Sequence, residues 1–235
     1  MNSAENLSLP PVETTAGPRE IVEAGLLAAC GPVTLACSFG VEDVVLIDLL
    51  RDHLDRVTVF AIDTGRLNEE TYEVAESVAR RFGLRIDWYF PRRHAVESLE
   101  GEKGLFSFRE SLENRRECCR IRKVEPLQRA LAGFSGWITG MRRQQSVTRS
   151  GLAPLEVDTT NGGILKINPL AFWSAKEVWA YADEKRLPVN RLHRIGYPSI
   201  GCAPCTRAIE ADEPPRAGRW WWENPEHKEC GLHRR

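Results

Sequence analysis

The chain has 235 residues, of which 42% are hydrophobic and 28% are charged, and its formal net charge is −1. This balance is typical of a globular domain and excludes a strongly basic nucleic-acid binder. No run of eighteen apolar residues is present, so we expect no membrane span and neither a membrane nor a nucleic acid as partner.

Residues 1–18 contain three prolines and few apolar residues, which predicts a flexible N-terminal tail. The same stretch lacks the basic and apolar segments of a signal peptide, so we expect a cytoplasmic protein. The remainder divides into an α/β domain at 19–213 and a C-terminal tail at 214–235.

Within the domain, short apolar strands alternate with amphipathic helices. The last predicted helix opens with a capping box formed by Ser174 and Glu177. Alternation of this kind predicts an α/β fold, a mainly parallel twisted sheet with helices on both faces. The predicted elements are strands at 33–37, 57–62, 84–90 and 137–140, and helices at 41–54, 69–82 and 174–186.

Three loops are expected at the carboxyl edge of the sheet, where such folds bind their ligands. Ser38-Phe39-Gly40 leads into a helix whose free N–H groups can bind an anion, although many α/β proteins have such a turn. Asp63-Thr64-Gly65-Arg66 is either a plain turn or a nucleotide contact. Segment 139–149 holds three arginines, which indicate either an anion site or a solvated surface.

Four of the seven cysteines form two pairs, Cys118 with Cys119 and Cys202 with Cys205. Adjacent cysteines make a poor disulfide because their Cα atoms are only about 3.8 Å apart. In a reducing compartment, paired cysteines more often bind metal or carry out redox chemistry. Spacing alone leaves zinc and an iron–sulfur cluster nearly equally open.

The other three cysteines differ from these pairs. Cys30 and Cys37 lie in apolar surroundings and are expected to be small core residues. Cys230 stands among polar residues near the end of the chain, with no second cysteine close by. We therefore expect Cys230 to be a nucleophile rather than part of a frayed chain end without a function.

Cations surround both cysteine pairs, and acidic residues are sparse in the run 118–123. We therefore expect the cations to stabilise an anionic centre and attract an anionic substrate, rather than only to face solvent. Three roles stay open for the nearby run Trp220-Trp221-Trp222: these side chains belong to the hydrophobic core, anchor the C-terminal tail, or contact a partner protein. The cations are Arg115, Arg116, Arg120, Arg122 and Lys123 at the first pair, and Arg207, Arg216 and Arg219 after the second.

Together, these motifs closely resemble the assimilatory adenylyl-sulfate reductases, of the iron–sulfur type. The resemblance runs from about residue 33 to 233 and implies an adenine nucleotide alpha-hydrolase-like fold. The matching segments are Ser38-Phe39-Gly40 with Glu42-Asp43, Asp63-Thr64-Gly65-Arg66, Cys118-Cys119 with Arg122-Lys123, Cys202 with Cys205, and Lys228-Glu229-Cys230-Gly231-Leu232-His233.

The resemblance also implies the roles of individual residues. It implies a [4Fe–4S] cluster on Cys118, Cys119, Cys202 and Cys205, and it makes Cys230 the catalytic nucleophile. The residues that match substrate-contacting positions of the family are Ser38, Phe39, Gly40, Ile62, Asp63, Thr64, Lys123, Gly140, Arg149, Arg216, Arg219 and His233.

The implied reaction reduces adenosine 5′-phosphosulfate to sulfite and AMP. The Cys230 thiolate attacks the sulfur, AMP leaves, and thioredoxin releases sulfite from the S-sulfocysteine. A nucleophile on a mobile terminus can close over the substrate and then open to the reductant. The oligomeric state stays open, with a homo-oligomer among the candidates.

Three alternatives remain. An iron–sulfur tRNA-thiolating enzyme would need the ATP loop Ser-Gly-Gly-x-Asp-Ser, where this chain has Ser-Phe-Gly-Val-Glu-Asp, so we do not expect ATP use. A zinc-binding module without activity is the second alternative. The third is a 3′-phosphoadenylyl-sulfate reductase without a cluster, a type that lacks the four paired cysteines.

Overall fold

A six-stranded sheet forms the centre of the molecule. The computed structural model describes residues 9–145 and 149–224. The strand order is β3-β2-β1-β4-β6-β5, and each neighbouring pair is parallel except β5 with β6. This confirms the predicted fold class. The strands are β1 (Val33–Cys37), β2 (Val57–Ile62), β3 (Ile86–Tyr89), β4 (Gly136–Ile138), β5 (Leu155–Asp158) and β6 (Ile164–Ile167).

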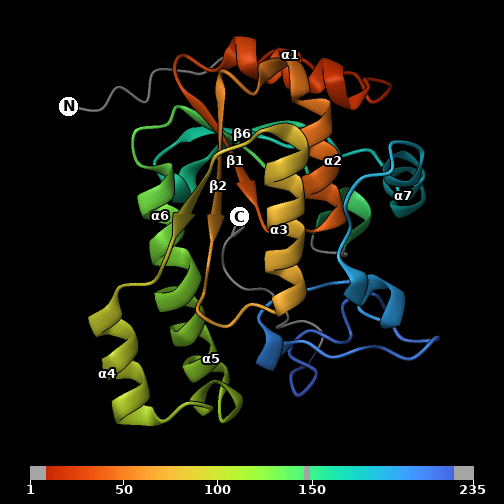
Figure 1. The fold of residues 1–235 in the computed structure, drawn as a ribbon. Coiled ribbons are helices and arrows are strands. Elements are labelled where there is room, and N and C mark those ends of the chain that lie inside the picture. Colours follow the sequence, from red (N-terminus) through yellow and green to blue (C-terminus); the bar gives the residue numbers. More distant parts are fainter. Residues whose placement is uncertain (1–8, 146–148, 225–235) are drawn as a thin grey trace.

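Helices lie on both sides of the sheet (Figure 1), with α2, α3 and α7 on one side and α4, α5 and α6 on the other. Helix α7 begins after Ser174, whose hydroxyl and Glu177 form the predicted capping box. The α-helices of the described residues are α1 (Pro18–Ala28), α2 (Val41–Leu49), α3 (Glu69–Phe82), α4 (Arg93–Lys103), α5 (Leu112–Cys119), α6 (Glu125–Leu131) and α7 (Ala175–Glu184).

The side chains of strand β2 contribute to two hydrophobic cores, one on each face of the sheet. Successive side chains of a strand point to opposite faces. Val57 and Val59 therefore join the larger core with α1, α2, α3 and α7, whereas Phe60 packs with Leu127 of α6 and with Trp137 on the other face. Both faces of the sheet are thus covered, as expected for parallel strands.

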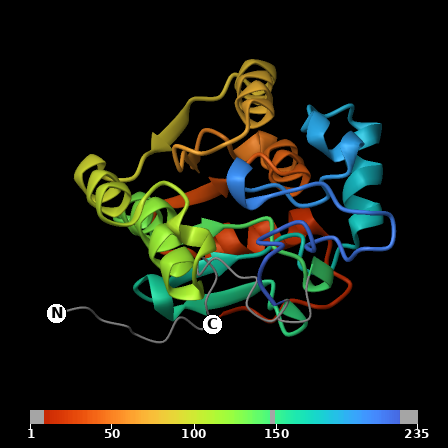
Figure 2. The ribbon, with the colours of Figure 1, turned by 90° about the horizontal axis from the view of Figure 1, so that it is seen from below.

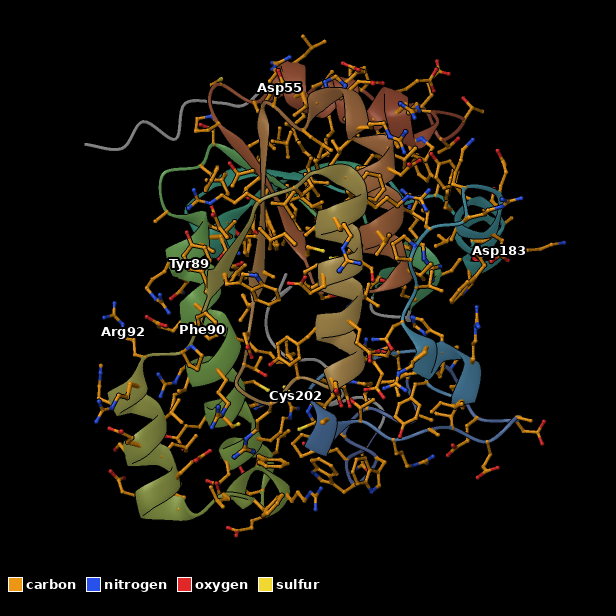
Figure 3. All side chains as sticks on the ribbon, in the orientation of Figure 1. Asp55, Tyr89, Phe90, Arg92, Asp183 and Cys202 are labelled. Carbon is orange, nitrogen blue, oxygen red and sulfur yellow. The ribbon has the colours of Figure 1, made fainter. Side chains whose placement is uncertain are left out.

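The carboxyl ends of the parallel strands meet at one edge of the sheet. In Figure 1 the arrow of β2 points to the lower half of the molecule, where α5 and the C-terminal part of the described chain lie. Figure 2 looks onto this edge from below. Figure 3 places Cys202 at this end and Asp55, which comes just before β2, at the opposite end. The paired cysteines are therefore on the predicted ligand-binding side.

Four predicted elements have different bounds in the structure. The strand expected at 137–140 is Gly136–Ile138, and the helix expected at 174–186 is Ala175–Glu184, with Ser174 and Lys185 as its caps. The other two differences are larger. The helix expected at 41–54 ends at Leu49, and a 3₁₀ turn, Arg51–His53, replaces its last part because the His53 N–H bonds to the Leu50 carbonyl. The strand expected at 84–90 begins at Ile86. Leu84 instead belongs to the end of α3, where its N–H donates to the Ala79 carbonyl after Gly83 at φ 64°.

Burial corrects one cysteine prediction. Cys37 is in the core as expected, whereas Cys30 is exposed because it follows the end of α1. Leu9, Val12 and Ala16 pack partly against the larger core, within the segment expected to be a tail. No helix within the described residues is both long enough and apolar enough to cross a bilayer.

Candidate active site

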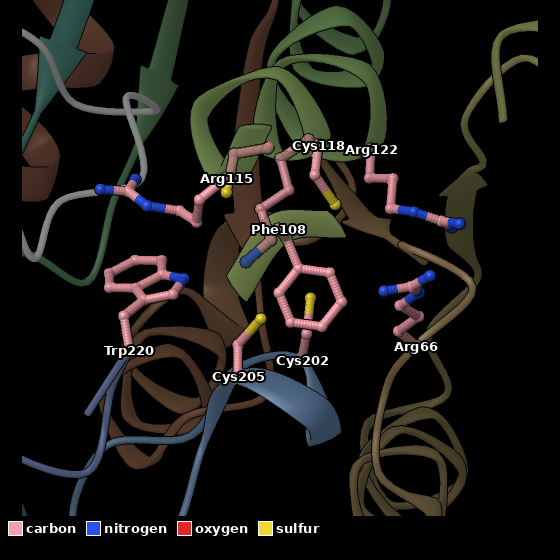
Figure 4. A pocket seen from close by; sticks show the side chains of 10 residues that line it. Arg66, Phe108, Arg115, Cys118, Arg122, Cys202, Cys205 and Trp220 are labelled. Carbon is pink, nitrogen blue, oxygen red and sulfur yellow. The ribbon is translucent and has the colours of Figure 1, made fainter. Parts of the chain in front are cut away.

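The four paired cysteines line one cavity. Cys118 and Cys119 end helix α5, whereas Cys202 precedes and Cys205 ends a short 3₁₀ turn, η8 (Ala203–Cys205). All four are buried, with at most 9% of each residue exposed. Figure 4 shows the sulfurs of Cys118, Cys202 and Cys205 pointing toward the middle of the cavity. The fold thus joins two pairs that are far apart in the sequence.

Local hydrogen bonding positions the first pair. The Ser111 hydroxyl caps α5 by accepting the Asn114 N–H at 3.1 Å. After Cys119 the helix widens into a π-helical turn, η3 (Arg120–Val124), before α6 begins at Glu125. Such turns are rare in proteins as a whole, and those that occur are often found at functional sites. The turn carries Arg122 and Lys123 to the cavity that Cys118 and Cys119 line.

The second pair is held by the turn that follows β2. The Ala203 N–H donates to the Arg66 carbonyl at 2.8 Å, and Thr64 Oγ1 lies 3.2 Å from Cys202 Sγ. The Trp220 N–H donates to the Cys205 carbonyl at 3.0 Å. The predicted turn 63–66 therefore contacts the cysteine cavity directly.

Cations line the same cavity, as the sequence indicated. Arg66, Arg115, Arg122 and Lys123 contribute to its wall, whereas Arg116 and Arg120 are exposed to solvent. Figure 4 shows Arg66 and Arg122 on one side of the cavity and Trp220 on the other.

Acidic partners of these cations come from distant parts of the chain. Glu100 on α4 bonds both Arg122 and Arg66, and the Arg66 contact is 2.6 Å. Glu223 pairs with Arg115 at 2.8 Å. The scarcity of acids in the run 118–123 therefore did not mean that the cations lack partners. They are fixed in place rather than solvated.

The surroundings shift the pKa values of three of the four thiols in different ways. The pKa of Cys202 is lowered: burial raises it, but Lys123, the Thr64 hydrogen bond and Arg219 together outweigh burial. Burial raises the pKa of Cys118. Burial and the charge of Cys202 raise the pKa of Cys205 to about 12. The protein alone therefore favours only the Cys202 thiolate among these three, and a bound metal would be needed to ionise the others.

Two buried N–H groups in the cavity wall have no hydrogen-bond partner among the residues that the structure describes. Among the described residues, no acceptor reaches Arg122 Nε or Trp220 Nε1, although both atoms are fully buried. An unpaired buried N–H group is costly, so each would gain from an acceptor inside the cavity.

The spacing of the donors bears on what could occupy this cavity. Within the described ranges, no three His, Cys, Asp or Glu side chains are arranged to hold one metal ion. A single zinc ion needs its ligands to converge on one point. An iron–sulfur cluster has several iron atoms, each with its own thiolate. The four cysteines are thiolate donors, a chemistry that suits both zinc and an iron–sulfur cluster.

The loop after β1 lies at the same carboxyl edge of the sheet as the turn after β2, because the two strands are parallel neighbours. The Ser38 N–H and hydroxyl donate to Asp43 Oδ2 at 2.6 and 2.7 Å. Burial is the main cause that raises the pKa of Asp43 to about 6. A Cβ atom on Gly140 would lie 2.5 Å from Asp43 Oδ1, so only glycine fits there. Ser38 and Gly140, expected to contact substrate, thus lie on either side of Asp43.

Phe39 is a strained residue in the same loop. Its φ of 60° is uncommon for a bulky side chain, and such strain clusters at functional sites. The ring is buried and stacks on Trp88 with 5.6 Å between centroids. A contact between Phe39 and a ligand would therefore involve its backbone, which continues into Gly40.

The turn after β2 lies at the same carboxyl edge of the sheet. Ile62 packs partly into the core around Phe60. Asp63 accepts hydrogen bonds from the Gly65 N–H at 2.7 Å and from the Tyr72 hydroxyl at 2.9 Å. Burial, followed by the Asp63 bond, raises the pKa of Tyr72 to about 12. Thr64 then contacts Cys202, so this turn lies between the carboxyl edge of the sheet and the cysteine cavity.

The three arginines of segment 139–149 have different surroundings. Arg142 donates to Glu42 Oε1 at 2.9 Å and Arg149 donates to Gln145 Oε1. Arg143 bonds the Leu152 carbonyl at 2.8 Å and stacks on Phe172, with 4.6 Å from guanidinium carbon to ring centroid. The Arg143 side chain therefore has a packing role in this structure, and we do not assign it to anion binding.

Some of the site residues predicted in the C-terminal part lie outside the described residues. Cys230 and His233 lie beyond residue 224. Arg219 is buried, donates to the Ile200 carbonyl at 3.1 Å and stacks on Trp220 at 4.8 Å. Arg216 is half-buried. Arg207, by contrast, forms a pair with Glu213 at 2.6 Å.

The three tryptophans, which the sequence left undecided, differ in burial. Trp220 is buried in the cavity wall and Trp222 is half-buried, whereas Trp221 is 39% exposed. Sequence reasoning also missed Phe108, which lies between the cysteines in Figure 4 and stacks under Arg66 at 5.0 Å. No local pattern marked it, because its neighbours come from α4, α5 and the C-terminal segment.

Comparisons with known proteins agree with this geometry. A family model described as "Phosphoadenosine phosphosulfate reductase domain" matches residues 32–208. Among curated proteins, the adenosine 5′-phosphosulfate reductase of Allochromatium vinosum is 54% identical over 203 residues, covering 86% of this chain and 79% of the relative. The enzyme of the same name from Burkholderia cepacia is 49% identical, with 86% and 80% covered.

Solved structures point to the same fold. The phosphoadenylyl-sulfate reductase of Candida auris, in a phosphate complex, superposes with a TM-score of 0.68 at 28% identity, covering 83% of this chain and 91% of that one. The FMN adenylyltransferase of Candida glabrata has a TM-score of 0.54 at 15% identity, covering 95% and 81%. The latter likeness concerns the fold alone.

Proposed function

The chain belongs to the phosphoadenosine phosphosulfate reductase domain family and groups with its adenosine 5′-phosphosulfate reductases, and from this premise we propose that it reduces adenosine 5′-phosphosulfate to sulfite and AMP. The observation that carries the proposal is the joining of all four paired cysteines in one cavity that the turn of Thr64 contacts, on the same side of the sheet as the loop of Ser38. The reaction belongs to the assimilation of sulfate.

Cys118, Cys119, Cys202 and Cys205 would hold a [4Fe–4S] cluster. The unpartnered N–H groups of Arg122 and Trp220 support this, because cluster sulfurs are acceptors. When bound, a cluster with four thiolate ligands supplies negative charge that stabilises the surrounding cations and ties α5 to the 3₁₀ turn at Cys205.

Substrate recognition falls to the residues at the carboxyl edge. The backbone of Ser38, Phe39 and Gly40 leads directly into the first turn of α2. The other residues at this edge are Ile62, Asp63, Thr64 and Gly140. These elements would hold the nucleotide, since N–H groups at a helix N-terminus bind anions. The cations proposed to contact the phosphosulfate are Lys123, Arg149, Arg216, Arg219 and His233.

Cys230 is proposed as the nucleophile. Its thiolate attacks the sulfur of the substrate, the sulfur–oxygen bond to the phosphate breaks, and AMP leaves with the bonding electron pair. Cys230 then carries a sulfonate group. Because a free cysteine titrates near pH ~8.5, nearby cations assist by favouring the thiolate. They also offset the repulsion between the thiolate and the anionic sulfonyl group.

Thioredoxin is the proposed reductant. One of its thiolates attacks the sulfur of Cys230, sulfite leaves, and a mixed disulfide forms. The second thioredoxin thiol resolves that disulfide, so Cys230 returns as a thiol and thioredoxin is oxidised by two electrons. This chemistry requires reduced thiols, and we therefore place the enzyme in the cytoplasm.

The proposed domain organisation follows from this division of roles. Residues 19–213 form the nucleotide-binding reductase domain, 214–235 carry the nucleophile, and 1–18 precede the domain. A segment that carries the nucleophile can serve first the substrate and then the reductant. A homo-oligomer is compatible with this organisation.

A second candidate is the reduction of 3′-phosphoadenosine 5′-phosphosulfate, which the likeness to the Candida auris enzyme favours. The deciding experiment is an anaerobic purification followed by sulfite release from each of the two sulfonucleotides with thioredoxin. We expect a strong preference in kcat/KM for adenosine 5′-phosphosulfate. Equal or reversed preference would contradict the proposal.

A further inference from the structure

A buried ion pair joins helix α5 to the C-terminal segment. Arg115 donates to both carboxylate oxygens of Glu223, from Nε to Oε1 at 2.9 Å and from Nη2 to Oε2 at 2.8 Å. The side chains are only 1% and 8% exposed. A bidentate pair of this kind fixes the relative orientation of its two partners.

Arg115 also contacts one of the proposed cluster ligands, Cys119. It hydrogen-bonds the Cys119 side chain and stacks on the ring of Trp220, with 4.7 Å from the guanidinium carbon to the ring centroid. Arg219 stacks on the same ring at 4.8 Å. One guanidinium therefore contacts Cys119, the tryptophan in the cavity wall and the carboxylate of the C-terminal segment.

The backbone of the segment is held at the same place. The Trp220 N–H donates to the Cys205 carbonyl at 3.0 Å, and the Glu223 N–H donates to the Trp220 carbonyl at 2.9 Å. Trp220 adopts a φ of 41°, a conformation that persists only where the surroundings impose it. Glu223 is thus anchored both by its side chain and through Trp220.

The anchor has a consequence for Cys230, which follows Glu223 by seven residues. A chain spans at most about 3.3–3.6 Å per residue, so the region that the Cys230 sulfur can reach is centred on the position of Glu223. Seven residues span at most about 25 Å, so fixing Glu223 in place bounds the distance of the Cys230 sulfur from the cavity wall to about that length. Without the pair, the same thiol would search a larger volume.

We propose that Arg115 and Glu223 are positioning residues, which anchor the segment leading to Cys230 beside the cysteine cavity and so set the rate of sulfur transfer. The inference rests on the proposed role of Cys230 as nucleophile. It does not require either residue to touch the substrate. The pair should therefore govern the rate of the transfer step and leave substrate affinity nearly unchanged.

The chain offers a matched control. Arg207 and Glu213 form a second bidentate pair in the same C-terminal part, with contacts of 2.6 and 2.7 Å. That pair is about one-third exposed and does not line the cysteine cavity. Glu213→Gln thus removes an equivalent contact without releasing the anchor.

The test uses the full-length, iron-loaded protein without thioredoxin. The quantities measured are the rate at which adenosine 5′-phosphosulfate adds a sulfonate to Cys230, the substrate Kd, the iron content, and hydrogen exchange of residues 219–224. For Glu223→Gln we expect a label rate at least about tenfold below wild type, a Kd within about twofold, unchanged iron and faster exchange. Glu213→Gln should match wild type.

Several results would overturn the inference. One is a wild-type label rate in folded Glu223→Gln, and another is a loss of affinity equal to the loss of rate. If Glu223→Gln does not fold or loses iron, Glu223→Asp decides, because it keeps the charge but shortens the reach. Normal labelling by Glu223→Asp would then refute the anchor. Absence of label on wild-type Cys230 would instead refute the proposed function, and faster exchange in the variant would still support the anchor.

Discussion

Thr64 and Cys202 are 138 residues apart in the sequence, yet the hydroxyl of one lies 3.2 Å from the sulfur of the other. This contact connects the turn after the second strand of the sheet to the second cysteine pair. It helps to lower the pKa of Cys202, together with Lys123 and Arg219 and against the effect of burial. The turn after β2, at the carboxyl edge of the sheet, is therefore in direct contact with the cysteine cavity.

The first prediction concerns iron. Cys118→Ser, Cys119→Ser, Cys202→Ser and Cys205→Ser should each lose the cluster, because a serine hydroxyl is a poor substitute for a thiolate on iron. Iron analysis and the visible spectrum near ~400 nm of anaerobically purified protein measure this loss. Cys30→Ser is the control, since Cys30 is exposed and distant from the cavity. Stoichiometric zinc without iron in the wild type would refute the prediction.

The second prediction concerns the close approach of Gly140 to Asp43. Gly140→Ala would place a Cβ 2.5 Å from Asp43 Oδ1, and relieving that overlap should cost about 2 kcal/mol of unfolding free energy. It should also weaken AMP binding, because Asp43 holds the Ser38 loop. Urea unfolding and AMP titration measure the two effects.

Gly101→Ala provides the matched control for that substitution. Gly101 lies within α4 with no atom within 4 Å of an added Cβ, so alanine should stabilise the helix by roughly 0.5–1 kcal/mol. If Gly140→Ala were as stable as wild type and bound AMP normally, the assigned role of this approach would be wrong.

The third prediction is a pH dependence of stability. Burial raises the pKa of Asp43 from 3.8 to about 6, so the folded state binds the proton more tightly than the unfolded state does. The stability that this proton contributes is full below pH 3.8 and is lost as the pH rises through 6. The difference of about 2 pKa units corresponds to roughly 3 kcal/mol.

Asp43→Asn isolates this contribution, because an amide does not titrate. The unfolding free energy of the wild type, relative to that of the variant, should fall between pH 4 and 6 and stay constant above about pH 7. Both proteins are compared by urea unfolding at each pH. A difference that stays constant from pH 4 to 7 would show that Asp43 keeps an ordinary pKa.

Much of the fold could be predicted from the sequence because it depends on local patterns. The helix at 69–82 has the predicted bounds, and the capping box at Ser174 has the predicted partners. Helix α5 was not predicted, since the positions it buries are Arg115, Cys118 and Cys119 rather than an apolar stripe. The π-helical turn after it depends on hydrogen-bond register, which has no simple sequence signal.

The candidate site could be predicted only as separate motifs. The cysteine pairs and the turns carry recognisable spacings, whereas Glu100, Phe108 and Glu223 carry none. These three residues act through contacts with Arg66, Arg122 and Arg115 that only the folded chain creates. The distant acids also explain why a local count of charges misjudged the surroundings of the cations.

The central claim is that Cys230 is the nucleophile, and one measurement tests it directly. The protein is incubated with adenosine 5′-phosphosulfate and no thiol reductant, and its peptides are examined by mass spectrometry. We predict a mass gain of one SO₃ group on the peptide that contains Cys230. Cys230→Ser should keep its iron and bind substrate but release no sulfite. A label on Cys30 or Cys37, or near-normal turnover by Cys230→Ser, would contradict the account.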